Sequence, residues 1–226
     1  MGLNLAWVET FEARDVLPGP GDLVRYLKTG PSLRSELPAL IDSAAEIFAD
    51  HATPMGVFSL VDVPSGSREL SRMAQIPFRS PLFTGATKLA FLVATLGPRP
   101  EARISGFFSG GDYLAGWILE AYSLAALDSV VKKLTAAIQG QAGPELQVGN
   151  VLNPGCHGLP LSTQKIIFAD DFGAAIGVRL NESQLMLPVK STSGILPLGR
   201  ELAYPAGSDT CRFCNRRRDC VYRHTG

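Results

Sequence analysis

The stretch from about Tyr113 to Ile138 is the feature of this sequence that most constrains its fold. It is apolar over most of its length, and Asp112 stands where the N-cap of a long helix is expected. Glu120 and Asp128 interrupt the apolar surface, and because carboxylates are rarely buried, we expect them to face solvent or to pair locally. Small side chains let neighbouring elements pack closely, so we predict a central helix with alanines at 115, 121, 125, 126, 136 and 137.

The rest of the chain predicts an irregular mixture of helices and strands. Residues 37–48 place their apolar side chains on one helical face, with Ser35 as a plausible N-cap. Lys88 to Leu96 is a continuous apolar run that ends at Gly97-Pro98, which is typical of a strand buried on both faces. Because the elements show no regular βαβ order, we predict an α+β fold. The other expected elements are strands at about 55–63, 174–180 and 184–187 and a helix from Ser162 or Thr163 to about Phe168.

Composition excludes several classes of protein. The chain has 226 residues, 46% hydrophobic and 19% charged, so it can bury a substantial core without disulfides. Its 21 basic and 21 acidic side chains balance, which argues against a general nucleic-acid-binding protein. The longest apolar stretch, Leu89 to Leu96, is too short to span a bilayer, and the N-terminal residues lack the pattern of a secretory signal. We therefore expect a cytoplasmic protein with no membrane partner.

All four cysteines of the chain are candidates for one metal site. Cys211, Cys214 and Cys220 form a C-x2-C-x5-C array near the C-terminus, and Cys156 stands upstream in the sequence Asn-Pro-Gly-Cys-His-Gly. Thiolates that converge from one short segment are suited to a soft metal or an iron–sulfur cluster. Three ligands leave a tetrahedral site incomplete, so we predict that Cys156 supplies the fourth. His157 could also be a ligand, although a single loop histidine is more often exposed or hydrogen-bonded.

The cysteine array lies within a basic tail. Between Cys211 and His224 the only acidic residue is Asp219, and five arginines surround it. These arginines balance the charge of the thiolates, form a docking patch for an acidic electron donor or corrinoid protein, or do both. Because residues 205–208 are expected to be a flexible approach, we predict a domain over residues 1–205 and a metal-binding tail over residues 206–226 that packs on it. The arginines assigned to the docking patch are Arg212, Arg216, Arg217 and Arg218.

The order of several short segments resembles a known family. Together they are similar to proteins related to the activation domain of vitamin B12-dependent methionine synthase. None of them is decisive alone, but the ordered set covers most of residues 20–200 and is specific. The segments are Ala94-Thr-Leu-Gly-Pro98, Gly111-Asp-Tyr-Leu114, Asn153-Pro-Gly-Cys156 followed by Gln164-Lys165, residues 176–183, Met186-x-Pro188, and Ser191-x-Ser193-Gly194.

The resemblance implies a fold and a ligand. The family forms one C-shaped α+β domain around a twisted antiparallel sheet, and it holds S-adenosylmethionine over a corrinoid. Pro154 and Gly155 retain part of the ligand loop, and Glu182 matches an acidic residue that could meet the ligand's amine. Val151 and Cys156, however, stand where the family has an arginine and a tyrosine. These two replacements count against binding of S-adenosylmethionine.

Three functional hypotheses follow from the resemblance and the cysteines. The first is a reductive activator of a corrinoid-dependent methyltransferase or methionine synthase, which relays an electron to cobalt through a [4Fe–4S] cluster on the four cysteines. Stand-alone relatives that reactivate corrinoid proteins can carry such C-terminal cysteines. The second is a non-catalytic module that binds a corrinoid protein and uses a structural Zn²⁺ to hold the tail. The third is a retained S-adenosylmethionine site. Whether the chain is itself an enzyme is left open.

Overall fold

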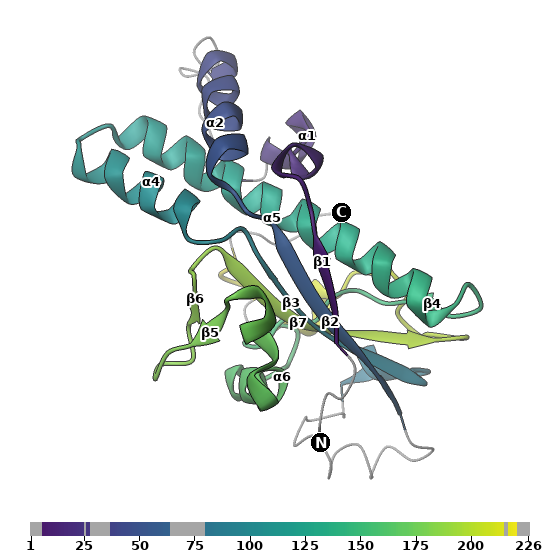
Figure 1. Cartoon of the computed structure of the whole chain (residues 1–226). Coiled ribbons are helices and arrows are strands. Elements are labelled where there is room, and N and C mark those ends of the chain that lie inside the picture. Colours follow the sequence, from purple (N-terminus) through teal and green to yellow (C-terminus); the bar gives the residue numbers. More distant parts are fainter. Residues whose placement is uncertain (1–5, 25, 28–36, 64–79, 215–216, 221–226) are drawn as a thin grey trace.

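Five antiparallel strands form a curled sheet in the order β1-β2-β3-β7-β4 (Figure 1). The structure is a computed structural model that describes residues 6–24, 26–27, 37–63, 80–214 and 217–220. A separate hairpin pairs β5 with β6. The strands are β1 (Trp7–Thr10), β2 (Met55–Asp62), β3 (Lys88–Thr95), β4 (Gln147–Val148), β5 (Arg179–Leu180), β6 (Met186–Leu187) and β7 (Ser191–Gly199).

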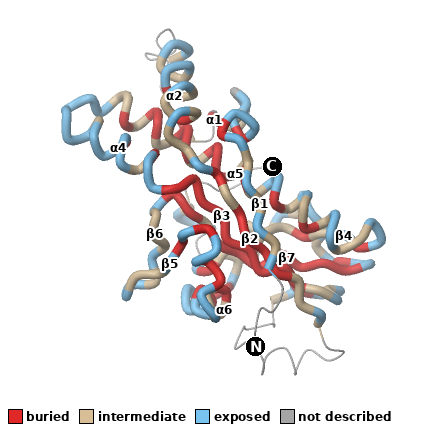
Figure 2. The backbone as a smooth tube through the Cα atoms, viewed as in Figure 1, coloured by how far each residue is buried: buried red, intermediate tan, exposed pale blue. Residues whose placement is uncertain are grey.

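Strand β3 is buried on both faces, as its apolar run predicts. Its side chains alternate between two hydrophobic clusters: Leu89, Phe91 and Val93 join one, and Ala90 and Leu92 join the other. None of these residues is more than 2% exposed. Figure 2 shows that β3 and much of its neighbours β2 and β7 are buried. The sheet therefore needs a covering layer on each side.

Helices cover the two faces unequally (Figure 1). The long helix α5, with α2 and α4 packed on it, covers one face, whereas α6 and the 3-10 segment η5 pack on the other. The predicted central helix is confirmed, and the Asp112 carboxylate caps it by accepting a hydrogen bond from the Ala115 amide at 3.1 Å. Ser35 lies outside the described residues. The helices are α1 (Pro20–Val24), α2 (Leu37–His51), α4 (Arg99–Ser109), α5 (Tyr113–Ala142), α6 (Gln164–Ile167) and η5 (Ala169–Ile176).

Helix α5 lies very close to the sheet where it crosses β2. A Cβ atom added at Gly56 would lie 2.8 Å from the methyl carbons of Leu134, which is closer than side chains tolerate. Leu134 itself is completely buried. Glycine in β2 therefore allows the helix to settle onto the sheet, and close packing of this kind leaves little room for larger residues.

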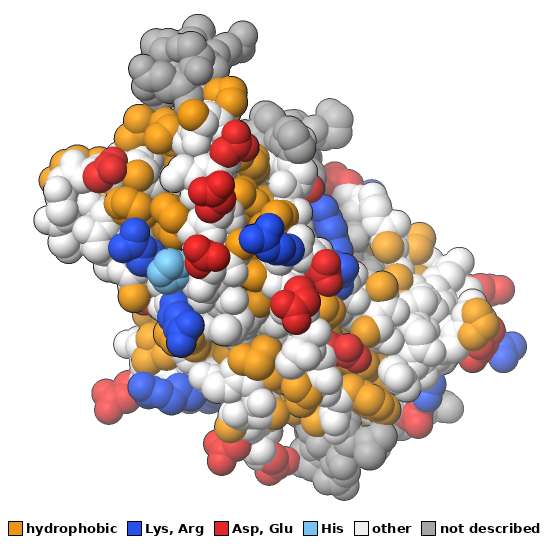
Figure 3. Space-filling model, turned by 45° about the horizontal axis from the view of Figure 1, so that its top comes forward, with side chains coloured by type: hydrophobic (Ala, Val, Ile, Leu, Met, Phe, Trp, Pro, Cys, Tyr) orange, Lys and Arg blue, Asp and Glu red, His pale blue; other side chains and the backbone are white. Residues whose placement is uncertain are grey.

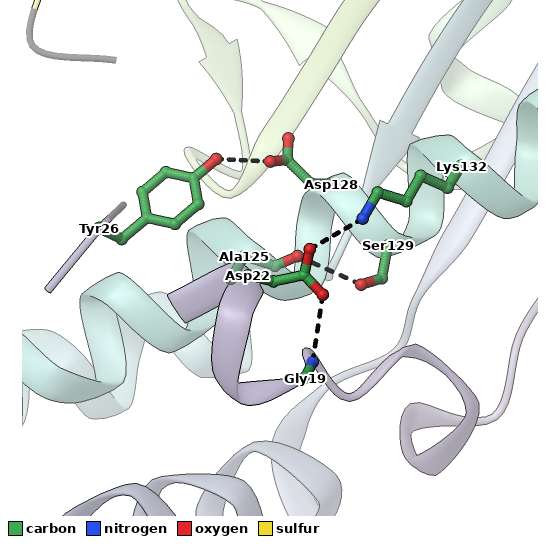
Figure 4. Close-up of polar contacts among 7 residues, drawn as sticks. All are labelled: Gly19, Asp22, Tyr26, Ala125, Asp128, Ser129 and Lys132. Atoms are coloured by element: carbon green, nitrogen blue, oxygen red, sulfur yellow. Dashed lines mark hydrogen bonds and ion pairs between the residues drawn. The ribbon is translucent and has the colours of Figure 1, made fainter. Parts of the chain in front are cut away.

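Polar contacts attach the short helix α1 and Tyr26, which follows it, to α5 (Figure 4). The Tyr26 hydroxyl donates to Asp128 Oδ2 at 2.5 Å, and Lys132 Nζ donates to Asp22 Oδ1 at 2.9 Å. Asp22 also accepts a hydrogen bond from the Gly19 amide. Asp128 is thus a partner for a residue 102 positions away, and the expectation of solvent exposure or a local partner was wrong for it.

Glu120 also pairs with a distant residue. Both of its carboxylate oxygens lie 2.8 Å from Nζ of Lys190, which is 70 positions along the chain and immediately precedes β7. The Lys190 side chain is 7% exposed, and that of Glu120 is 34% exposed. A buried ammonium group needs a counter-charge, so this ion pair ties α5 to the start of β7. The expectation for Glu120 was therefore also wrong.

The segment predicted as a strand at 174–180 is mostly not one. Residues 169–176 form the 3-10 segment η5, and only Arg179 and Leu180 pair as a strand. Asp170 and Asp171 have φ values of +54° and +55°, which break the extended geometry before the segment begins. Small residues such as Ala174 and Ala175 have little strand preference, so the local backbone follows the packing of Phe172 and Ile176 instead.

Helix α5 holds the most apolar long segment of the described residues, and charged side chains of both signs lie on the surface. Within the described ranges, α5 is the one helix that is long and apolar enough to cross a membrane, and 56% of its most apolar window is buried in the fold. Its apolar character is therefore accounted for by its central position.

On the face shown in Figure 3, acidic and basic side chains are interspersed among apolar ones. This mixture matches the zero net charge of the sequence.

We expect the Glu120–Lys190 ion pair to stabilise the fold more than an exposed ion pair does. Glu120→Gln leaves the buried Lys190 ammonium without its counter-charge, and the free energy of unfolding should fall by about 2 kcal/mol. Lys132→Gln is the control, because its pair with Asp22 has side chains 65% and 41% exposed. That variant should lose less than about 1 kcal/mol. Urea unfolding measures both, and equal losses would contradict the argument.

Candidate functional site

The loop of residues 153–159, here called the cysteine loop, begins at the edge of the sheet. Residues just before it continue along β7, where Leu152 and Ile195 exchange backbone hydrogen bonds of 2.9 and 3.0 Å. The Asn153 side-chain amide then donates to the Ser193 carbonyl oxygen at 2.9 Å and to Thr192 Oγ1 at 3.2 Å. These contacts hold the start of the loop in one place against the sheet.

The cysteine loop is a tight turn with its own hydrogen bonds. The Cys156 amide donates to the Asn153 carbonyl oxygen, the Leu159 amide donates to Cys156, and the Gly155 amide donates to Leu159, all within 3.0 Å. Gly155 has a φ of +82°, a conformation that glycine adopts without strain. Pro154 and Leu159 are buried, while Gly155 is exposed. The predicted site residues Pro154 and Gly155 therefore shape the backbone that presents Cys156.

Val151 packs into the fold rather than lining an open site. Its Cγ1 atom lies 2.3 Å from the place where a Cβ atom at Gly194 would be. It also joins the hydrophobic cluster on the α5 side of the sheet. The position at which the resembling family has an arginine is thus occupied by a packed aliphatic side chain, which offers no charge to a ligand carboxylate.

The approach to the tail is held by hydrogen bonds. The Ala203 amide donates to Thr84, and the Ala206 amide donates to Val148 at 2.8 Å. The Asn150 side chain donates to the Ser208 carbonyl oxygen at 2.8 Å and accepts from the Gly207 amide at 3.1 Å. The sequence suggested a flexible approach at residues 205–208, whereas the structure ties this segment to β4 and Asn150.

Three side chains, here called the tail clamp, connect the tail to the body: Tyr204, Arg212 and Phe213. The rings of Tyr204 and Phe213 meet edge to face, with centroids 5.0 Å apart and planes at 77°. The Arg212 guanidinium carbon lies 4.8 Å from the Tyr204 ring centroid and 4.6 Å from that of Phe213. Its Nη2 donates to the Tyr204 hydroxyl at 2.5 Å. No sequence pattern pointed to Tyr204 or Phe213.

The tail and the cysteine loop lie side by side. A Cβ atom added at Gly158 would lie 3.7 Å from the Phe213 carbonyl oxygen, so the two backbones are in near contact. Phe213 and Tyr204 also pack against the same hydrophobic cluster as Leu159. The segment of Cys211 to Cys214 is therefore next to the loop that carries Cys156.

The cysteine side chains themselves are not grouped as metal ligands. All four are half-buried. Cys211 begins a 3-10 turn, and the Cys214 amide donates to its carbonyl oxygen at 3.1 Å. Among the residues that the structure describes, which include all four cysteines, no three His, Cys, Asp or Glu side chains are placed to hold one metal ion. The structure thus brings the two segments together, and the four-cysteine site stays a prediction.

Several buried polar atoms near the cysteine loop have no hydrogen-bond partner in the described part of the chain. Burial lowers the pKa of His157, whose Nδ1 is one of these atoms, and the residue has a φ of +53°. The sequence favoured an exposed or hydrogen-bonded histidine, and Nδ1 is neither. The others flank the loop at its two ends and are suited to a polar ligand or to water: Thr163 Oγ1, Gln164 Oε1 and Ser193 Oγ.

Glu182 lies in a different element from the cysteine loop, the turn between β5 and β6. The turn is closed by hydrogen bonds between Asn181 and Leu185. Glu182 is exposed at its tip, and no polar contact in the described residues joins it to Pro154 or Gly155. The predicted ligand residues therefore occupy two separate elements, the cysteine loop and this hairpin.

Comparison with known proteins identifies a structural neighbour. No family model and no curated protein matches the sequence, whereas 13 chains of solved structures match the fold. One is the crystal structure of the MetH reactivation domain bound to AdoHcy, with a TM-score of 0.60 and 13% sequence identity. The match covers 88% of this chain and 80% of that chain. The chain therefore has the fold of the MetH reactivation domain, which confirms the predicted α+β architecture with a curled antiparallel sheet and one long helix.

Proposed function

We propose that this protein is a reactivation-domain-like accessory of a separate corrinoid-dependent methyltransferase or methionine synthase. The observation that carries the proposal is the shared fold, which extends over 88% of this chain and 80% of the MetH reactivation domain. A match over 88% of the chain takes in most of its helices and strands. Because one fold can serve different functions, partner binding is the direct test of the proposal. The cytoplasmic location and the boundary at residue 206 stay predictions.

The finer part of the proposal assigns a metal group to Cys156, Cys211, Cys214 and Cys220. It is supported by the near contact of Gly158 with Phe213 and by the chemistry of four thiols, which are suited to a [4Fe–4S] cluster or to Zn²⁺. Binding would have to draw the four sulfur atoms together from their present positions. A cluster would supply one-electron transfer to the corrinoid, whereas zinc would only hold the tail on the body.

The exposed arginines of the tail are the proposed docking patch. Arg217 and Arg218 are exposed, while Arg216 lies outside the described residues. Arg212 is also exposed, but it packs on two aromatic rings of the tail clamp. An acidic corrinoid protein or electron donor that meets Arg217 and Arg218 would associate faster through charge attraction.

A retained S-adenosylmethionine site is the alternative function. The neighbour's structure holds AdoHcy, and the exposed Glu182 would be free to meet a ligand amine. Against it stands Val151, a packed aliphatic side chain just before the cysteine loop, which offers no charge to the ligand carboxylate. The geometry therefore favours an accessory that binds its partner without this ligand.

Partner binding is the test of the main proposal. The probe is a cobalamin-loaded methionine synthase from which its own reactivation domain has been removed, and calorimetry measures association. We expect binding that weakens with salt and falls on the order of tenfold in Arg217→Ala/Arg218→Ala, because two attractive charges are lost. Arg14→Ala/Lys133→Ala removes two exposed charges elsewhere and should bind normally. No association at any salt concentration would refute the proposal.

Anaerobic purification tests the metal group. We expect a coloured protein with about four iron and four sulfide per chain, and a large loss of both in Cys156→Ser, because a cluster of this kind needs four thiolates. Ser162→Ala, an exposed change just beyond the cysteine loop, should leave the content unchanged. A colourless protein with one zinc would show that the site is structural. A protein that contains neither iron nor zinc would refute the four-cysteine assignment.

Calorimetric titration with S-adenosylmethionine separates the main proposal from the alternative. We expect no heat of binding, because Val151 supplies no charge for the ligand carboxylate. Heat that disappears in Glu182→Gln but persists in Glu145→Gln, another exposed glutamate, would instead establish the S-adenosylmethionine site.

A further inference from the structure

We propose that the tail clamp of Tyr204, Arg212 and Phe213 positions Cys211 and Cys214 against the cysteine loop before any metal binds. The inference rests on the proposed role of the four cysteines and assigns residues that keep their segments together. It makes Arg212 a positioning residue within the protein rather than part of the surface that docks a partner.

Arg212 holds Tyr204 and Phe213 together. One guanidinium contacts two rings at 4.8 and 4.6 Å and donates to the Tyr204 hydroxyl at 2.5 Å. A guanidinium is planar and weakly hydrated, so it can stack on an aromatic face while its edge donates a hydrogen bond. Arg212 therefore uses both its face and its edge within the clamp. A lysine would keep the charge but could not make both contacts.

Phe213 anchors the turn of the tail to the body of the protein. Its ring packs edge to face on Tyr204 and against the hydrophobic cluster beneath the sheet, and its carbonyl oxygen lies beside Gly158. The flanking residues Arg212 and Cys214 must follow it, because the 3-10 turn from Cys211 to Phe213 is closed by the hydrogen bond from the Cys214 amide. Anchoring Phe213 thus places both cysteines of the turn next to the cysteine loop.

Tyr204 is itself held at the edge of the sheet by the residues that follow it. Tyr204 is followed by Pro205, which bridges Gly149, and by Ala206, whose amide donates to Val148. Gly149 and Val148 belong to the same edge segment that leads into the cysteine loop. The clamp and the loop are therefore attached to one rigid edge of the sheet, and none of the contacts involved is a metal–ligand bond.

Such an arrangement should favour metal binding. Bringing the tail turn to the loop in advance removes part of the conformational entropy that binding would otherwise have to overcome. Cys211 and Cys214 would then already lie beside the cysteine loop when a metal binds.

Amide hydrogen exchange on the reduced, metal-free protein tests the proposal. Arg212→Ala should speed exchange of the Phe213 and Cys214 amides by on the order of tenfold or more, because the turn opens more often. Arg212→Lys should give a similar increase, and Tyr204→Phe, which keeps the ring but loses the hydroxyl, a smaller one. Arg200→Ala is the matched control, an exposed arginine outside the clamp. Exchange in Arg212→Ala equal to that of this control would overturn the proposal.

Titration with Co²⁺ gives a second readout, because thiolate ligation produces an intense absorption band. We expect Arg212→Ala to bind Co²⁺ about tenfold more weakly than the wild type, and Arg200→Ala to bind it equally well. Equal affinity in Arg212→Ala would count against preorganisation by the clamp. Should the wild type bind no Co²⁺, the four-cysteine assignment fails, and with it the role of the clamp in metal binding. Neither readout involves the corrinoid partner. Failure of the clamp proposal can therefore be told apart from failure of partner binding.

Discussion

The fold depends on the burial of β3 between two hydrophobic clusters. Its side chains alternate strictly between the α5 side and the α6 side of the sheet, and each set is almost completely buried. Apolar burial at about 25 cal/mol per Å² is the main favourable term in folding, so a strand covered twice organises everything around it. Helix α5 can approach closely because Gly56 has no side chain that would clash with Leu134. The remaining elements are placed by where they meet this sandwich.

The candidate site forms where two segments of the chain leave the same edge of that sheet. The segment after β4 runs along β7 through the Leu152–Ile195 pair, and residues 205–206 return beside the same segment at Gly149 and Val148. Two parts of the chain about fifty residues apart therefore leave the sheet at one edge, one as the cysteine loop and the other as the tail. The near contact of Gly158 and Phe213 follows from this shared edge rather than from any affinity between cysteines.

Elements with a strong local pattern could be predicted, and those shaped by tertiary packing could not. The helix from Tyr113 and the strand from Lys88 were correct because each has a long, continuous apolar signal. Helix α4 was missed because Pro100 and Gly106 obscure it, although proline is well tolerated in the first turn of a helix. The strand expected at residues 174–180 was wrong except at Arg179 and Leu180, because the left-handed Asp170 and Asp171 redirect the backbone before it. No local pattern could show that.

The sequence by itself determined the central helix, the doubly buried strand and the spacing of Cys211, Cys214 and Cys220, because these are properties of neighbours along the chain. It also showed the resemblance that the fold comparison bears out as architecture. Only the tertiary structure decided that Lys190 meets Glu120, that Arg212 stacks on Tyr204, and that the tail turn lies beside the cysteine loop. Each of these contacts joins chain segments that local pattern treats separately. Their meeting is set by strand register and by how the chain leaves the sheet, which no residue specifies alone.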